Sequence, residues 1–242
     1  MKRDTSGRRI IQRNRKKQKK TERNRKKQKE TERNRGEGEM ITWQEWGYII
    51  GGYLSGSVLY SYLLPKALKG IDITAESPDG NPGTANTFTC AGIPIGILVL
   101  CMELLKGYLP VHLALQRVDP ARWNFALILA APVLGHACPF FQPQKGGKAI
   151  AVSFGVLLGL VPFWLPVLSL VALYLIFSLV IVIEPHFYRS ICTFVLFSVN
   201  MICRLTMTGI SIGCCLISAV VIRKHYDRYR GEQMKVRLPL HR

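Results

Sequence analysis

Metal-binding patterns of cysteine and histidine are absent from this 242-residue sequence. None of its seven cysteines belongs to a C-x-x-C pair, and no cluster of cysteine and histidine has the spacing of a zinc site. Most of the cysteines lie inside apolar runs, which is typical of small, reduced, buried side chains. The sequence therefore predicts neither a disulfide framework nor a bound metal.

Acidic residues are few, since 15 Asp and Glu stand against 33 Lys and Arg, for a formal net charge of +18. Residues 1–39 hold 17 of the basic residues and only 6 of the acidic ones. They contain a near-perfect repeat, RNRKKQKKTE followed by RNRKKQKETE. A segment of such low complexity, with almost no apolar residues, cannot bury a core. It also lacks the apolar region of a signal peptide.

Three interpretations of residues 1–39 stay open. The segment could bind nucleic acid or anionic lipid through its charge, form a solvated tail without a role, or precede a working start at Met40. The close repeat resembles a recent tandem duplication in the coding DNA, which favours the last two. For the chain as a whole, a basic excess beside apolar runs indicates cytoplasmic loops and anionic headgroups, so no nucleic-acid partner is expected.

Charge is also missing from long stretches of the remaining chain. Residues 156–183 carry no charge at all, and a soluble helix is seldom apolar on every face for that length. Apolar runs near 20 residues match the thickness of a bilayer core. The sequence therefore predicts an all-α, polytopic membrane bundle of about seven transmembrane helices. The expected spans are 46–64, 88–105 with a continuation toward 115, 124–141, 149–164, 166–183, 187–203 and 207–222.

The spans can be oriented from the basic residues between them. Lysines follow the first and third spans, an arginine follows the fifth, and residues 223–242 form a basic tail after the bundle at 40–222. The positive-inside rule places these regions in the cytoplasm, which predicts a multi-pass protein of the cell inner membrane with cytoplasmic loops. Seven spans would export the basic residues 1–39, a conflict that a start at Met40 or a count of six spans removes.

Proline leaves one boundary open. Pro162 and Pro166 lie in the longest apolar stretch. They either split it into two spans or only kink one long helix.

Two polar loops interrupt the apolar background. Residues 77–86 read SPDGNPGTAN and precede a helix expected to begin near Thr84; the glycines suit a phosphate at a helix N-terminus, or an ordinary turn. Residues 135–148 read GHACPFFQPQKGGK, with Lys145 and Lys148 on either side of two glycines. These lysines either contact an anion or anchor the chain at the headgroups. The Walker pattern is absent, because no Ser or Thr follows Lys148.

Four motifs occur along the chain in a characteristic order. They are Gly56-Ser57, Gly80-Asn-Pro-Gly83 with Asn86, Leu105-Lys-Gly107 followed by Pro110-Val111, and Gly135-His136 through Lys145-Gly-Gly-Lys148. Their succession resembles the acyl-phosphate:glycerol-3-phosphate acyltransferase (PlsY) family of bacteria, of which this chain looks like a divergent member. The resemblance is close over residues 46–160 and looser in the C-terminal third.

The resemblance implies transfer of an acyl group from acyl phosphate to glycerol 3-phosphate, giving lysophosphatidic acid in phospholipid synthesis. It implies these two substrates and membrane lipids as partners, with no cofactor and no metal. Acyl phosphate is already activated, so the protein mainly has to position the reactants and neutralise phosphate charge. No His-x4-Asp pattern follows any histidine, which argues against the acyl-CoA-dependent class.

The resemblance also implies roles for individual residues. In catalysis we expect Lys148, from the lysine–glycine loop, Thr193, near the position of a family serine, and His225, from the family's C-terminal His-Arg-Glu-Asn motif. His136 is interpreted as structural. The residues expected to bind phosphate or substrate are Asn81, Gly83, Asn86, Lys145, Gly146, Gly147 and Arg228.

Three positions depart from the family pattern, since Asp79 replaces a serine, Thr89 an arginine and Arg228 an asparagine. A carboxylate beside two phosphorylated substrates should repel them, and each lost phosphate contact costs about 1.5–3 kcal/mol. Arg228 could compensate in part. The sequence thus predicts an acyltransferase with reduced activity.

Two alternatives stay open. One is a catalytically silent paralogue that binds lipid or a partner enzyme. The other, a transporter, is weaker, because the spans contain few ionisable residues beyond Glu103 and Arg204.

Overall fold

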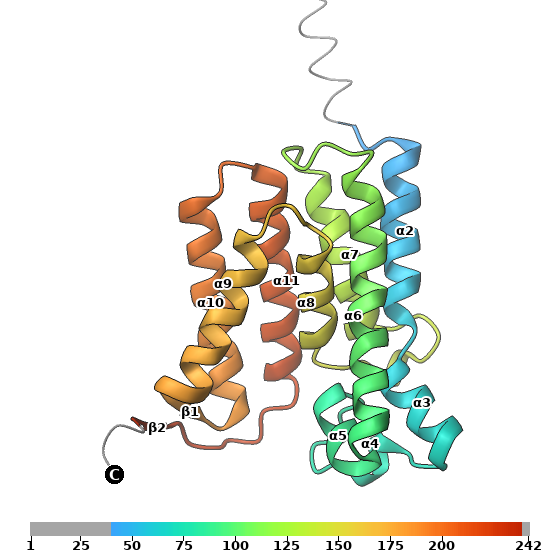
Figure 1. The fold of residues 1–242 in the computed structure, drawn as a ribbon, viewed down its shortest axis with the longest axis vertical. Coiled ribbons are helices and arrows are strands. Elements are labelled where there is room, and N and C mark those ends of the chain that lie inside the picture. Colours follow the sequence, from blue (N-terminus) through green and yellow to red (C-terminus); the bar gives the residue numbers. More distant parts are fainter. Residues whose placement is uncertain (1–39, 239–242) are drawn as a thin grey trace, which may run out of the picture. The chain divides into compact units, whose positions relative to one another are not determined.

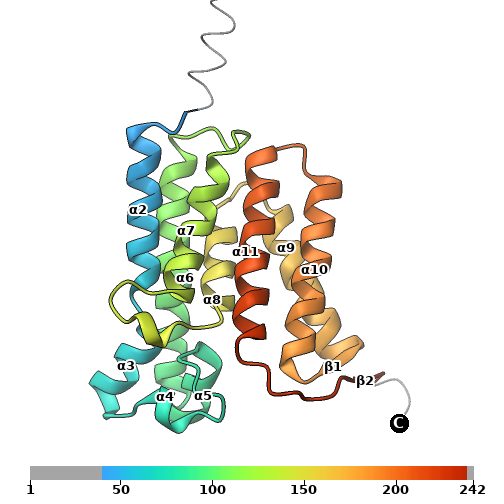
Figure 2. The ribbon, with the colours of Figure 1, turned by 180° about the vertical axis from the view of Figure 1, so that it is seen from behind.

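The helices of the protein form a membrane-type bundle (Figures 1 and 2). The structure is a computed structural model that describes residues 40–238, so the predictions for residues 1–39 and 239–242 lie outside the described residues. The α-helices are α2 (Trp43–Ser57), α3 (Tyr60–Lys69), α4 (Ile73–Glu76), α5 (Thr84–Ala91), α6 (Ile93–Leu115), α7 (Phe125–Ala137), α8 (Ile150–Leu158), α9 (Leu165–Leu175), α10 (His186–Arg204) and α11 (Thr208–Tyr226).

Each of the seven predicted spans contains one of these helices, namely α2, α6, α7, α8, α9, α10 or α11. The prediction of a helical membrane bundle is confirmed. Among the described residues, α6, α10 and α11 are long and apolar enough to cross a membrane, whereas α7 and Leu165–Val180 are shorter apolar helices. The number of spans therefore stays a prediction.

The helices differ from the predicted runs at three breaks. The first run is divided between α2 and α3, and the second between α5 and α6 at Gly92, whose φ of 89° is unfavourable for other residues. The longest apolar stretch splits into α8 and α9 rather than forming one kinked helix. Pro166 lies in the first turn of α9, where its missing N–H breaks no helical hydrogen bond.

Short elements complete the fold. Pro143–Lys145 form a 3₁₀ turn in the second polar loop, and Ile176–Val180 continue α9 as a π-helix. Strands β1 (Val182–Glu184) and β2 (Lys235–Arg237) pair antiparallel. Residues 223–226 thus continue α11 for another turn, and the described residues after them contact the bundle through Arg228 and through β2.

Glycines let neighbouring helices touch through their backbones. A Cβ atom on Gly56 of α2 would overlap the carbonyl oxygen of Pro132 in α7, and one on Gly135 of α7 would overlap that of Tyr53 in α2. In membranes, close packing at small residues holds helices together, because lipid tails remove the hydrophobic drive for association. These contacts fix the start of the second polar loop against the end of α2.

Candidate functional site

The first polar loop is folded around the carboxylate of Asp79. Its Oδ1 atom accepts hydrogen bonds from Asn86 Nδ2 at 2.7 Å and from the backbone N–H of Asn81 at 3.1 Å. Asn86 Nδ2 also donates to the carbonyl oxygen of Asn81 at 2.8 Å. Asp79 therefore closes the turn that leads into α5, and the N-terminal residues of α5 face a cavity.

Lys148 connects the second loop to the first, because its Nζ atom lies 2.8 Å from Asp79 Oδ2. Partial burial raises the pKa of Asp79, but the hydrogen bonds from Lys148 and Asn86 outweigh it, so the pKa lies below its usual range. Asp79 is therefore ionised at neutral pH. The ion pair stabilises the fold above the ordinary pKa of an aspartate, and this contribution is lost as the pH falls through the lowered value.

Arg228 ties both loops to the segment that follows α11. Its Nη1 atom donates to the carbonyl oxygen of Asp79 at 2.9 Å, and its Nη2 atom donates to that of Gly146 at 3.0 Å. The guanidinium group thus points inward, which the sequence left undecided. Its two contacts are with backbone oxygens, so Arg228 holds the loops in place.

Two cavities adjoin at these loops. The larger, of about 450 Å³, has polar residues of both loops at one part of its wall and apolar residues of α6 and α8 at another. The smaller, of about 240 Å³, is more polar and is lined by residues of the first loop, the start of α10 and the segment after α11. Three residues line both cavities: Asp79, Lys148 and His186.

Most of the predicted site residues meet at these cavities. Gly147 packs its Cα against the ring of His136, which lines the larger cavity, and a side chain there would overlap that ring. Gly146 contributes the carbonyl oxygen bound by Arg228. The predicted residues that line one or both cavities are Asn81, Gly83, Asn86, Lys148, His225 and Arg228.

Two predicted residues point elsewhere. Lys145 Nζ lies 3.6 Å from the centroid of the Tyr62 ring and 3.9 Å from Asp72. Thr193 is fully buried, and its hydroxyl group donates to the carbonyl oxygen of Arg189, one turn earlier in α10, at 2.8 Å. Their roles in the site stay predictions. The α10 hydroxyl nearer to the cavities belongs to Ser190.

The departures from the family pattern differ in their surroundings. Thr89 is exposed, and its hydroxyl donates to the carbonyl oxygen of Ala85 at 3.2 Å, within α5. Asp79 stands in the wall of both cavities with its charge already paired. The repulsion expected of this carboxylate thus takes the form of competition, since Asp79 and a phosphate group would use the same ammonium group of Lys148.

Two imidazole rings stack beside the smaller cavity. The ring centroids of His186, the first residue of α10, and His225, in the last turn of α11, are 5.6 Å apart with 14° between the planes. His225 Nδ1 donates to the carbonyl oxygen of Val221 at 2.8 Å. Among the described residues the buried Nε2 atom of His225 has no hydrogen-bond partner. This leaves Nε2 as an unused acceptor on a residue that lines the smaller cavity.

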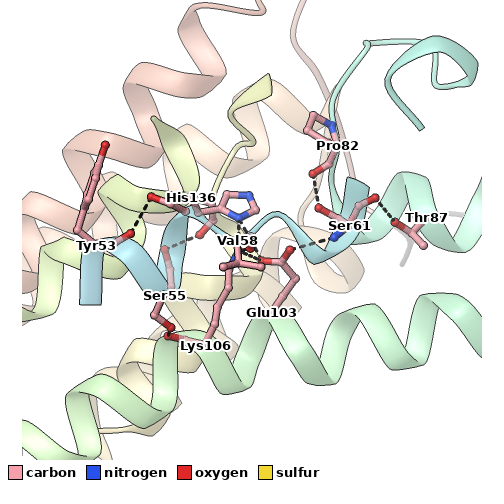
Figure 3. A network of polar contacts seen from close by, with 12 residues as sticks. Tyr53, Ser55, Val58, Ser61, Pro82, Thr87, Glu103, Lys106 and His136 are labelled. Atoms are coloured by element: carbon pink, nitrogen blue, oxygen red, sulfur yellow. Dashed lines mark hydrogen bonds and ion pairs between the residues drawn. The ribbon is translucent and has the colours of Figure 1, made fainter. Parts of the chain in front are cut away.

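A buried ionic cluster (Figure 3) includes His136, which lines the larger cavity. Lys106 Nζ is 2.7 Å from Glu103 Oε2, 2.9 Å from His136 Nδ1 and 2.7 Å from the carbonyl oxygen of Val58. Glu103 Oε1 accepts a hydrogen bond from the backbone N–H of Ser61 at 3.2 Å. The cluster joins α6 and α7 to the break between α2 and α3, consistent with a structural role for His136.

Sequence reasoning missed this cluster and His186. The spacing of Glu103 and Lys106, one helical turn apart in an otherwise apolar run, is the signal that would have identified the pair. His186 lies outside the family motifs, and only its position at the start of a span distinguishes it.

The fold and the site define an integral membrane protein of helical architecture, in which two glycine-containing loops, joined by the Asp79–Lys148 ion pair, meet at adjoining cavities. A family model described as glycerol-3-phosphate acyltransferase matches residues 46–231. The chain therefore belongs to the glycerol-3-phosphate acyltransferase family.

Individual relatives agree with this assignment. Curated glycerol-3-phosphate acyltransferases of Halalkalibacterium halodurans and Myxococcus xanthus are 37% and 39% identical over 48% and 47% of this chain. The chain spans little more than half the length of these two relatives, 57% and 59%. The enzyme of the same name from Trichlorobacter lovleyi is 37% identical over 74% of this chain and 89% of its own.

A solved structure is also similar. The crystal structure of PlsY (YgiH), an integral membrane glycerol 3-phosphate acyltransferase, in its glycerol 3-phosphate form matches with a TM-score of 0.67 at 26% identity. The match covers 76% of this chain and 89% of that one.

Proposed function

We propose that this protein transfers an acyl group from acyl phosphate to glycerol 3-phosphate, giving lysophosphatidic acid for phospholipid synthesis. The observation that carries the proposal is the pair of cavities with a shared wall of Asp79, Lys148 and His186. The apolar lining of the larger cavity suits an acyl chain, and the polar lining of the smaller one suits a small phosphorylated acceptor. The shared wall brings their reacting groups together.

The chemistry requires charge neutralisation and one proton acceptor. Lys148 binds the phosphate of the acyl donor, and Asn81 and Asn86 hold the loop that faces it. The acceptor hydroxyl oxygen attacks the acyl carbon, the bond from that carbon to the phosphate oxygen breaks, and inorganic phosphate leaves. His225 Nε2 accepts the hydroxyl proton, since its Nδ1 atom is committed to Val221.

We further infer that the loops face the cytoplasm of a cell with this protein in its inner membrane. Helices α3, α4 and α5 lie at one end of the bundle (Figures 1 and 2), and both cavities are lined by residues of the loop that leads into α5 and by Lys148. Glycerol 3-phosphate, which is soluble, then reaches the smaller cavity from water. The acyl donor enters the larger cavity from the lipid and contacts the apolar residues of α6 and α8 that line it.

The proposal is tested with the full-length protein in phospholipid vesicles supplied with acyl phosphate and labelled glycerol 3-phosphate. Labelled lysophosphatidic acid above the level of vesicles without protein is the expected result. A parallel reaction with acyl-CoA is expected to give none. Absence of product with both donors would reject the enzymatic function and leave the catalytically silent paralogue.

Replacement of Asp79 by asparagine is expected to lower the KM for acyl phosphate, or the inhibition constant of inorganic phosphate, by about fivefold. The amide keeps an acceptor for Asn86 but no longer competes with phosphate for Lys148. A partly exposed ion pair is worth about 1 kcal/mol, and 1.4 kcal/mol corresponds to a factor of ten. Steady-state kinetics at fixed ionic strength measures the change.

Asp72→Asn is the matched control. Asp72 accepts a hydrogen bond from the backbone N–H of Thr74 at the start of α4, outside the wall of both cavities. Its KM is expected to stay within about twofold of wild type. A higher KM in Asp79→Asn than in this control would show that Asp79 supports substrate binding instead of opposing it.

A further inference from the structure

His186 occupies the junction of the two cavities and belongs to none of the sequence motifs. It is one of the three residues that line both cavities, beside the ion pair of Asp79 and Lys148. Its side chain is exposed, whereas the stacked His225 ring is 1% exposed. One edge of the His186 ring is therefore open to the place where donor and acceptor would meet.

The hydrogen bonds of the two rings give their Nε2 atoms opposite roles. The hydroxyl group of Tyr174 donates to Ser190 Oγ at 3.3 Å, and Ser190 Oγ lies 2.9 Å from His186 Nδ1. Among the described residues, Nδ1 of His186 is the one acceptor that Ser190 Oγ contacts, so we place the Ser190 hydrogen in this bond. The neutral His186 ring then carries its hydrogen on Nε2, whereas the His225 ring carries it on Nδ1.

We propose that His186 is a catalytic residue, whose Nε2–H donates a hydrogen bond to the acyl carbonyl oxygen during acyl transfer. The inference rests on the proposed function and adds a residue to it. Of the residues lining both cavities, Lys148 is assigned to the phosphate group, and the negative Asp79 cannot stabilise negative charge on the carbonyl oxygen. His186 is the remaining donor of this shared wall.

The step balances without a further reactant. As the acceptor hydroxyl oxygen bonds to the acyl carbon, the electron pair of the C=O bond moves onto the carbonyl oxygen, where the His186 N–H stabilises it. The pair returns when the carbon–oxygen bond to phosphate breaks. The hydroxyl proton passes to His225 Nε2 and leaves with the phosphate, so His186 keeps its proton throughout.

Two substitutions separate the two ring nitrogens. In His186→Gln the side-chain amide lies near the position of Nε2, so the variant keeps an N–H donor there but loses the hydrogen bond with Ser190. In His186→Asn the amide lies near the position of Nδ1, which keeps the Ser190 contact and removes the donor. We expect the asparagine variant to lose about 100-fold in kcat, with the KM for glycerol 3-phosphate within about threefold of wild type. The glutamine variant should stay within about tenfold of wild-type kcat.

The outcomes are distinguishable. A glutamine variant slower than, or equal to, the asparagine variant overturns the proposal, because the Ser190 contact or the ring as a whole would then matter. If the wild-type protein is active and the asparagine variant is equally active, the role of His186 is overturned but the proposed function stands. If the wild-type protein is inactive, the proposed function itself is overturned.

A second variant covers the case in which an exchange at His186 unfolds the protein. Ser190→Ala retains the His186 ring but frees its Nδ1 atom, so the hydrogen can move to the wrong nitrogen. We expect kcat to fall about tenfold in the wild-type background and not at all in the His186→Gln background. An unchanged kcat for Ser190→Ala in the wild-type background contradicts the proposal.

Discussion

Replacement of Lys148 by alanine is expected to lower kcat/KM for acyl transfer by about 100-fold or more. Lys148 is the one lysine among the residues lining both cavities, and its Nζ atom is held at the junction by Asp79 at 2.8 Å. Removing a charge-assisted contact to the reacting phosphate costs about 2.7–4 kcal/mol in the transition state. Initial rates at several concentrations of both substrates measure the loss.

Lys145→Ala is the matched control from the same loop. The Lys145 side chain lies over the Tyr62 ring and near Asp72, so we expect its kcat/KM to stay within about threefold of wild type. Together the two variants also test the prediction from the sequence that Lys145 binds substrate. Equal losses in both would show that phosphate binds between the lysines, away from the cavities.

Replacement of Glu103 by glutamine is expected to destabilise the bundle by about 3–5 kcal/mol, because it leaves the Lys106 ammonium group buried without its anionic partner. Glu103 and Lys106 are 0% and 4% exposed, so water cannot replace the lost charge. Thermal unfolding of the purified protein in detergent, followed by circular dichroism, gives the change.

Two comparisons support this measurement. Glu184→Gln removes an ion pair with Arg237, at 3.3 Å, whose side chains are 43% and 68% exposed, and it is expected to cost less than about 1 kcal/mol. The double variant Glu103→Leu with Lys106→Met removes both buried charges and should be more stable than Glu103→Gln. If Glu103→Gln destabilises the protein no more than Glu184→Gln does, water or lipid headgroups reach the buried cluster.

The sequence was sufficient for the helices but not for their ends. An apolar run of bilayer length is a property of local composition, and each of the seven runs contains a helix. The division of the first run depends on a tertiary contact. The break between α2 and α3 is held by Lys106, which bonds the carbonyl oxygen of Val58 from another helix.

The two loops of the site could be predicted from the sequence, but the directions in which their side chains point could not. Lys145 and Lys148 lie on either side of the same two glycines, yet the Lys145 ammonium group lies over the Tyr62 ring and that of Lys148 lies beside Asp79. Asp79 and Lys148 are 69 residues apart, so their pairing could not be read from local spacing. The same limit applies to the choice between Ser190 and Thr193. Their positions along α10 do not say which of the two hydroxyl groups contacts Tyr174 of α9.

The double contact of Arg228 has a consequence for biosynthesis. The residue lies 149 positions after Asp79 and 82 after Gly146, so this tether can form only after the last helix has been synthesised, whereas the Asp79–Lys148 pair can form earlier. A nascent chain already inserted through α8 would hold both loops without their common tether. The protein is thereby kept from presenting a finished anion pocket in the membrane before its assembly is complete.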